Sequence, residues 1–319
     1  MVSGPLGNVG YWTPRRYGVV VLVSTEWLAA HLDDPGLVVI DLRWRQDGSG
    51  RARYDAGHVP GARFLDWTTD IVDPDHHVAF MLAPLDRFAS ALGRLGIGDD
   101  STIVAYADDH GSGPYRLWWG CRVYGHDIVH VLDGAFEKWT AEGRPISAEP
   151  ASEPRAGARF TSGPSVARVR ARAEDVAAAA TDPQTVVLDS RPDEQYRGLA
   201  VWFETGPIAA GADGIADTPR GRLRAGHVPW AGNVPAASLY RPDFTMKDPD
   251  ELRELLGAAG VTDGCSAITY CGVGISASAL LFALVRAGVT DAALYDASWE
   301  EWGRDPSRPV AREVSSTRP

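Results

Sequence analysis

Cysteine is scarce in this chain: Cys121, Cys265 and Cys271 are the three that occur among its 319 residues. A small, odd number of cysteines without close spacing argues against a disulfide framework and against a zinc site. It also fits a reducing compartment, so we expect a cytoplasmic protein. Each thiol is then either an inert buried group or a reactive nucleophile.

Long apolar runs are missing too. The longest near the N-terminus, residues 19–23, is far too short to cross a bilayer or to form the apolar part of a signal peptide. A surplus of positive charge is also missing, because the formal net charge is −11. We therefore expect neither a nucleic-acid nor a membrane partner. A small anionic substrate is not excluded, since charge close to a site matters more than the total.

The segment around Cys271 is the most informative part of what the chain does contain. An apolar run ends in this cysteine, a short glycine-containing loop follows, and an apolar stretch then continues to residue 285. The order predicts a strand, a tight loop and a helix. A thiol at that place faces unpaired backbone N–H groups and the positive end of a helix dipole, which stabilise the nucleophilic thiolate.

We therefore interpret Cys271 as a catalytic nucleophile and the loop after it as an anion-binding element. The glycines allow the backbone to curl around the sulfur, and the loop amides face the charge that develops there. Ser276 and Ser278 are expected to cap the helix. The predicted loop comprises Gly272, Val273, Gly274, Ile275, Ser276 and Ala277.

Segments of the first half of the chain recur in the second half, which indicates an internal duplication. Four segments recur in the same order: Val-Val-Ile-Asp-Leu-Arg at 38–43 and Val-Val-Leu-Asp-Ser-Arg at 186–191, Gly-His-Val-Pro at 57–60 and 226–229, Ile-Val-Ala-Tyr at 103–106 and Ala-Ile-Thr-Tyr at 267–270, and Leu-Asp-Gly-Ala-Phe-Glu-Lys-Trp at 132–139 and Tyr-Asp-Ala-Ser-Trp-Glu-Glu-Trp at 295–302. The first spacing differs, so the second half carries an insertion of 21 residues before its Gly-His-Val-Pro.

Each half alternates short apolar strands with helical stretches, which predicts an α/β fold with parallel sheets covered by helices. Helices are expected at 25–31, 85–95, 117–124, 173–180, 249–259 and 276–287. A proline-containing stretch without periodicity indicates a linker. The predicted organisation is a domain at 18–145, a linker at 146–165 and a second domain at 166–309.

The halves differ where chemistry is expected. Tyr106 is followed by Ala-Asp-Asp-His-Gly-Ser-Gly, with no cysteine at the place that matches Cys271. The second half is therefore the candidate catalytic one and the first half a supporting one. Residues that recur in both halves, such as Asp189 and Arg191, cannot explain activity in one of them, so we expect them to be structural.

Together these motifs resemble the tandem-domain rhodanese family of thiosulfate and 3-mercaptopyruvate sulfurtransferases, from about Val21 to Pro309. The resemblance implies two rhodanese-like domains, each a five-stranded parallel sheet flanked by helices, with the cysteine in the second. It also implies a reaction in which the thiolate takes a sulfane sulfur and passes it to cyanide or a thiol. No metal or organic cofactor is implied.

Several positions of this sequence differ from the family pattern, and these differences bear on which sulfur donor is used. Thiosulfate enzymes often place a positive residue after the cysteine, and this loop is neutral. The Cys-Gly-x-Gly pattern resembles the mercaptopyruvate branch, although Val273 stands where that branch has a serine. That branch binds the donor carboxylate with two arginines: Arg220 matches one, while the other falls at Gln195, with Arg197 two residues on. His58 matches a family histidine near the site.

Two alternatives remain open at this point. The chain could be a persulfide carrier that delivers sulfur to a partner protein, with weak turnover of small donors. A cysteine phosphatase or arsenate reductase is disfavoured, because the phosphatases need an arginine where Ala277 stands. The expected partners are a small sulfur donor and acceptor, together with a sulfur-accepting protein under the carrier alternative.

Overall fold

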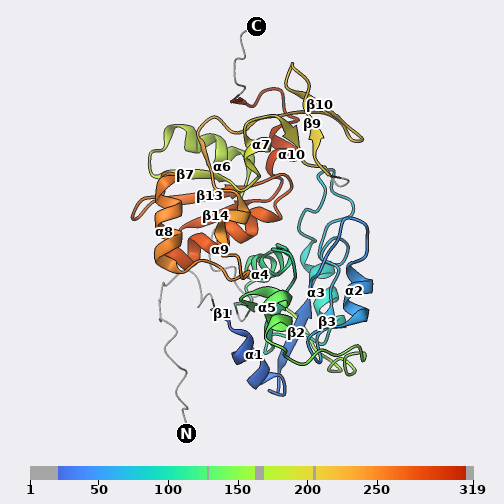
Figure 1. Ribbon diagram of the computed structural model, residues 1–319. Helices are drawn as coiled ribbons and strands as arrows, with labels where there is room; N and C mark the ends of the chain where they lie inside the picture. The colour runs from blue at the N-terminus through green and yellow to red at the C-terminus, as the bar shows by residue number, and fades with distance from the viewer. Residues whose placement is uncertain (1–20, 128, 162–168, 204–205, 314–319) are drawn as a thin grey trace.

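The computed structural model describes residues 21–127, 129–161, 169–203 and 206–313 (Figure 1). Each half of the chain forms a five-stranded parallel sheet with helices on its faces. This confirms the expected α/β architecture of two sheets. The first residues of the predicted first domain, 18–20, and part of the predicted linker, 162–168, lie outside the described residues.

The first half has the strand order β1-β5-β4-β2-β3, with every pairing parallel. Its central strands are continuous apolar runs because helices cover both faces of the sheet. The strands are β1 (Val21–Val23), β2 (Leu37–Asp41), β3 (Arg63–Phe64), β4 (Thr102–Tyr106) and β5 (Val129–Leu132), and the helices are α1 (Thr25–His31), α2 (Gly50–Ala56), α3 (Leu85–Arg94), α4 (Gly113–Val123) and α5 (Ala135–Ala141).

The second half repeats this topology as β12-β7-β13-β14-β6. Position by position, this is the order of the first sheet read from its other edge, so the duplication seen in the sequence is a duplication of the fold. Its sheet strands are β6 (Arg170–Ala171), β7 (Thr185–Asp189), β12 (Ala231–Asn233), β13 (Ser266–Tyr270) and β14 (Ala292–Tyr295), and its helices are α6 (Ala173–Ala178), α7 (Asp193–Tyr196), α8 (Pro249–Ala258), α9 (Ser276–Ala287) and α10 (Ser298–Trp302), with single 3₁₀ turns at η1 (Ala179–Thr181) and η2 (Ala236–Leu239).

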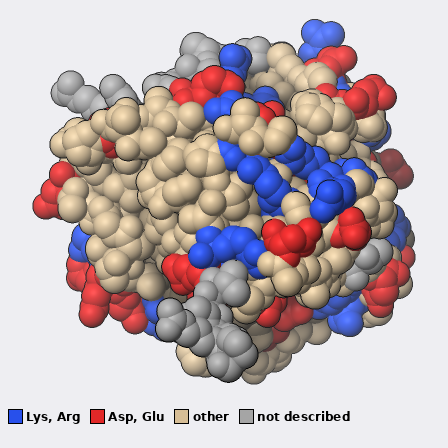
Figure 2. Space-filling model, turned by 90° about the horizontal axis from the view of Figure 1, so that it is seen from above, with Lys and Arg blue, Asp and Glu red and all other residues tan. Residues whose placement is uncertain are grey.

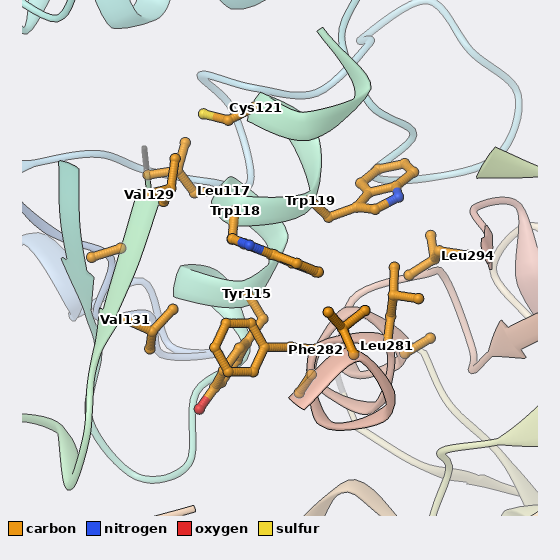
Figure 3. Packing of buried hydrophobic residues seen from close by; sticks show 14 of the residues in the cluster. Tyr115, Leu117, Trp118, Trp119, Cys121, Val129, Val131, Leu281, Phe282 and Leu294 are labelled. Carbon is orange, nitrogen blue, oxygen red and sulfur yellow. The ribbon is translucent and has the colours of Figure 1, made fainter. Parts of the chain in front are cut away.

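The two halves share one hydrophobic core at the contact between α4 and α9. Figure 3 shows the aromatic side chains of α4 pointing toward α9, and the Phe282 ring lies 5.1 Å from both the Tyr115 and Trp118 rings. Helix α9 is apolar almost all round because it is enclosed between its own sheet and α4. The halves therefore form a continuous body, and the ends of α4 and α9 are fixed relative to each other.

The insertion in the second half forms two antiparallel hairpins. One pairs β8 (Ala200–Val201) with β9 (Ile208–Ala209), and the other pairs β10 (Ile215–Thr218) with β11 (Gly221–Arg224). Strand β10 lies at the upper end of Figure 1, and the view of that end in Figure 2 shows Lys and Arg side chains gathered on the surface, although the net charge is −11. Among the described residues no helix is long and apolar enough to cross a membrane.

The described part of the predicted linker, 146–161, lies against the first half. Phe160 is 5% exposed and its ring centroid lies 5.7 Å from that of Phe88. Thr161 donates hydrogen bonds to the Asp99 carboxylate from both its backbone N–H and its hydroxyl, each at 2.6 Å. This stretch therefore packs as part of the first half's surface.

Candidate active site

Cys271 lies immediately after β13, at the carboxyl end of the second sheet, and is 3% exposed. Its backbone N–H donates to the Ser298 hydroxyl at 3.1 Å, and its carbonyl accepts from the Trp299 N–H at 2.9 Å. Gly272 is held in the same way, because its carbonyl accepts from the Glu300 N–H at 2.9 Å. Helix α10 thus fixes the backbone that carries the thiol.

The loop after Cys271 presents a row of unpaired backbone donors. Within the described part of the chain, the amides of residues 272–277 have no hydrogen-bond acceptor. The expected serine cap is wrong: the Ser276 hydroxyl pairs with the Ser190 hydroxyl at 2.9 Å, and Ser278 donates to the Ile275 carbonyl at 2.6 Å. The first amides of α9 are therefore left to bind an anion beside the cysteine.

The loop conformation depends on Gly274 and on a contact between the halves. Gly274 has φ +78°, and a Cβ there would lie 2.5 Å from the Asp296 carbonyl oxygen. The Asp296 carboxylate accepts from Arg116 of α4 at 2.6 Å, from Arg170 at 3.0 Å and from the Leu82 N–H at 3.1 Å. Arg116 also donates to the Gly274 carbonyl at 3.4 Å. A fully buried arginine of the first half thus holds the loop of the second.

A cavity of about 490 Å³ opens between the halves, and Cys271 lies in its wall. Its sides include three tryptophans: Trp44 and Trp67 come from the first half, with ring centroids 5.5 Å apart, and Trp202 comes from the insertion. A mostly apolar pocket with a few polar groups is typical of a small-molecule site. The lining residues with charged or polar side chains are Arg45, Gln46, Asp108, Asp109, Ser112, Arg191, Gln195 and Ser276.

Arg191 supplies a fixed positive charge to this cavity. Its guanidinium binds the Asp189 carboxylate at 2.6 Å and the Gly226 carbonyl at 2.6 Å, and it lies 4.5 Å from the Trp299 ring centroid. Burial by itself would lower the pKa of Arg191. The Asp189 carboxylate, together with a smaller contribution from Cys271, more than offsets the effect of burial, so the pKa of Arg191 is raised. Its Nη1 is buried and has no partner among the described residues.

The structural role expected for Arg191 is therefore confirmed by its pairing with Asp189, but that role is incomplete. Because this arginine recurs as Arg43 in the first half, the sequence indicated a structural role alone. The structure shows that Arg191 also lines the cavity that contains Cys271. The sequence alone held no sign of the free Nη1. The tryptophan walls were missed as well, because Trp44, Trp67 and Trp202 come together only across the contact between the halves.

The remaining predicted substrate residues lie in different places. Gln195 lines the cavity and is 4% exposed. Arg197, Arg220 and His58 do not line it. Arg197 lies 3.5 Å from the Asp193 carboxylate on its own helix.

Arg220 is exposed beside the turn between β10 and β11, where it lines a separate hollow with His76 and His77. The insertion folds into hairpins and does not bring this arginine, which matches a family arginine in sequence, into the cavity that holds the cysteine. His58 is buried in the first half, where its ring nitrogens lie 2.8 Å from the Tyr54 carbonyl and 3.1 Å from the Glu149 carbonyl.

The family described as Rhodanese-like domain matches residues 24–142 and 172–305. The chain is 32% identical over 308 residues to the sulfur carrier protein TtuD of Thermus thermophilus, covering 95% of this chain and 99% of that protein. It is 34% identical over 292 residues to the thiosulfate sulfurtransferase of Rattus norvegicus, covering 89% and 92%. The structure of SseA from Escherichia coli, a 3-mercaptopyruvate sulfotransferase, superposes with a TM-score of 0.72 at 29% identity, covering 88% and 99%.

Proposed function

This chain belongs to the rhodanese family, and we propose that it is a sulfurtransferase in which Cys271 carries sulfur as a persulfide between a donor and an acceptor. The observation that supports this proposal is that the backbone amides of residues 272–277, which directly follow the thiol, have no acceptor among the described residues. Such donors can stabilise a negatively charged sulfur. The matching loop of the first half has Ala107 in place of the cysteine, so one half performs the chemistry.

In the first half-reaction the Cys271 thiolate attacks the outer, sulfane sulfur of the donor. With thiosulfate, the bond between the two sulfur atoms breaks and its electron pair leaves with sulfite, so the enzyme keeps a persulfide. The loop amides hold the charge on the terminal sulfur, as an oxyanion hole holds oxygen. The Arg191 guanidinium, fixed by Asp189, adds positive charge to the same cavity.

In the second half-reaction a nucleophile, such as cyanide or a thiol, attacks the outer sulfur. The persulfide bond breaks and Cys271 leaves as a thiolate, ready for the next donor. Because the enzyme alternates between two covalent states, the proposal predicts ping-pong kinetics. The chemistry needs no metal or organic cofactor, since the sulfur itself accepts and releases the electron pair.

A persulfide carrier is the second candidate, and one observation favours it. The neutral loop and the positions of Arg197 and Arg220 outside the cavity leave small anionic donors without the arginine pair that the mercaptopyruvate branch uses. A carrier would form the same persulfide on Cys271 but deliver it to a protein. The similarity to a sulfur carrier of Thermus thermophilus is consistent with this candidate.

The test is the intact mass of the protein after incubation with thiosulfate and, separately, with 3-mercaptopyruvate. Wild type is expected to gain one sulfur atom, Cys271→Ser to gain none, and Cys265→Ser to behave as wild type. The faster donor identifies the branch. No gain with either donor would contradict small-molecule sulfurtransfer and would leave the carrier candidate, to be tested with a protein persulfide as the donor.

A further inference from the structure

We propose that Gln195 is a specificity-determining residue, and that it selects an uncharged, amide-bearing organic thiol as the sulfur substrate. The proposal rests on the proposed persulfide chemistry of Cys271. Gln195 lies on α7, four residues after Arg191 in the sequence, and is 4% exposed. Its side chain lines the same cavity as Cys271.

The side-chain oxygen of Gln195 has no hydrogen-bond partner among the described residues. This Oε1 atom is buried, while the backbone N–H of Gln195 donates to the Pro192 carbonyl at 3.0 Å. Buried polar groups are nearly always hydrogen-bonded, so an unpaired one beside a reactive thiol indicates a partner supplied by the ligand. A primary amide offers both an acceptor and a donor, which matches the N–H and C=O of another amide.

The charges around the cavity do not favour an anion at this position. Among its described lining residues, Arg45 is already bound to the Asp108 carboxylate at 2.6 and 2.7 Å, and Arg191 is bound to Asp189. Asp109, whose side chain is exposed at the cavity, adds negative charge. Each arginine of the lining is thus already paired with a carboxylate, so a neutral amide fits the position at Gln195 better than a carboxylate does.

The size and walls of the cavity point to an organic substrate. Its volume of about 490 Å³ falls within the roughly 300–1,000 Å³ of sites that hold drug-sized ligands. Thiosulfate would leave much of that space to water. The indoles of Trp44, Trp67 and Trp202 offer apolar surface to methylene groups between a thiol at Cys271 and an amide at Gln195.

The transfer step balances without any oxidant. The acceptor thiol loses its proton, and the resulting thiolate attacks the outer sulfur of the Cys271 persulfide. The bond between this sulfur and Sγ breaks, Cys271 leaves as a thiolate, and the acceptor becomes a persulfide that takes up the proton. In the reverse direction the same organic persulfide would serve as a donor.

The test first loads Cys271 with inorganic polysulfide, removes the excess, and confirms the added sulfur by intact mass in each variant. Loaded protein is then mixed with N-acetylcysteamine, which is a neutral amide thiol, with 3-mercaptopropionate, which carries a carboxylate, or with 1-butanethiol, which has neither group. The rate at which the added sulfur is lost is followed by mass. Ratios of these rates between variants cancel the intrinsic reactivity of each thiol.

Wild type is expected to prefer N-acetylcysteamine, and Gln195→Met, which keeps the side-chain length without the amide, should lower its rate relative to butanethiol by roughly tenfold or more. Gln195→Arg should move the preference to 3-mercaptopropionate. Gln184→Met, at an exposed glutamine that does not line the cavity, is the matched control and should keep the wild-type ratios.

Three outcomes decide the proposal. A shift of the ratios in the Gln195 variants alone supports it. Loading followed by wild-type ratios in Gln195→Met overturns it while leaving the proposed function intact. Failure of wild type to load at Cys271 contradicts the proposed function, and this proposal with it.

Discussion

The two halves of the molecule have the same scaffold beneath their loops. In the first half, Arg43 binds the Asp41 carboxylate and donates to the Gly57 carbonyl, both at 2.7 Å. In the second, Arg191 binds Asp189 and donates to the Gly226 carbonyl, both at 2.6 Å. The buried tyrosines that end β4 and β13 also accept equivalent backbone N–H groups. These shared contacts maintain the fold and do not explain activity.

The halves differ in the loop that follows the central strand. In the first half, the Asp109 N–H donates to the Glu137 carboxylate at 2.7 Å, and Asp108 pairs with Arg45. In the second half, Glu300, which matches Glu137, binds Arg304 at 2.7 Å instead. The first loop therefore has an amide paired with a carboxylate from α5, whereas the amides of residues 272–277 in the second loop have no acceptor among the described residues. The two loops thus differ in their contacts as well as in the cysteine.

The largest expected effect comes from moving the thiol between the halves. Cys271→Ser should lower the rate of sulfur transfer by about 10⁴-fold or more, as removal of a catalytic nucleophile does. Adding Ala107→Cys to that variant should not restore transfer, because the first loop carries acidic groups where an anion would bind. The measurement is the rate of thiocyanate formation from cyanide. Recovery in the double variant would show that the cysteine alone separates the halves.

The next effect concerns the matching loop positions Gly274 and His110. Both have a positive φ, +78° and +54°, but a Cβ at Gly274 would collide with the Asp296 carbonyl. In Gly274→Ala the alanine would also have to adopt a left-handed backbone conformation, which costs about 1–2 kcal/mol in addition to that collision. We expect it to lower the rate of persulfide formation by at least roughly tenfold, since 1.4 kcal/mol is a factor of ten. His110→Ala should keep that rate, and equal effects of the two changes would contradict this account of the loop.

Asp296 has a strong expected effect on stability. Asp296→Asn would leave the fully buried Arg116 without its carboxylate, and breaking such a pair costs about 3–5 kcal/mol. Denaturant unfolding should show this loss, and persulfide formation should slow because Arg116 also contacts the Gly274 carbonyl. A variant with wild-type stability would contradict the proposed support of the loop by the first half.

Asp133 occupies the position in the first half that matches Asp296. Replacing it by asparagine is expected to change stability less than Asp296→Asn does, and to increase stability where Asp296→Asn decreases it. Burial raises its pKa, and the hydrogen bond from the Met246 N–H, at 2.8 Å, offsets this only in part. Because the folded pKa exceeds the unfolded one, the stability that protonated Asp133 contributes is lost as pH rises through the folded pKa. Asp133→Asn should therefore raise the denaturation midpoint at pH 7.

The pH dependence of that gain is the control. The advantage of Asp133→Asn should fade as pH falls through the titration of this carboxyl, because the protonated aspartic acid and the asparagine are then both neutral. A variant that is less stable than wild type at pH 7, or a gain that does not change with pH, would show that burial is not the reason for the raised pKa.

The sequence predicted the regular parts of the fold well, because they follow from periodicity. The bounds of α1 and α9 agree with the expected helices, and the strand, loop and helix around Cys271 are as expected. Helix α4 begins at Gly113, before the expected start, because Pro114 fits its first turn. Short helices such as α7, with four residues, contain too few turns to leave a periodic signal.

The site was predicted only in part, for a physical reason. Local sequence pointed to Cys271 and its loop, which directly follow β13, and the family resemblance pointed to Gln195, which lies on α7 and lines the same cavity. The cavity walls could not be predicted, since Trp44, Trp67 and Trp202 approach Cys271 only through the packing of α4 against α9 and the fold of the insertion. Arg220, which the family resemblance assigned to the substrate, lies on the insertion and does not line the cavity.

The most direct test of the central claim is to load the wild-type protein with inorganic polysulfide, digest it, and map the added sulfur to peptides by mass. The account predicts sulfur on the peptide containing Cys271 and none on Cys121, whose burial raises its pKa and disfavours a thiolate. Added sulfur on Cys121 or Cys265 in place of Cys271, or no stable sulfur on any of them, would contradict the claim that the second half holds the persulfide.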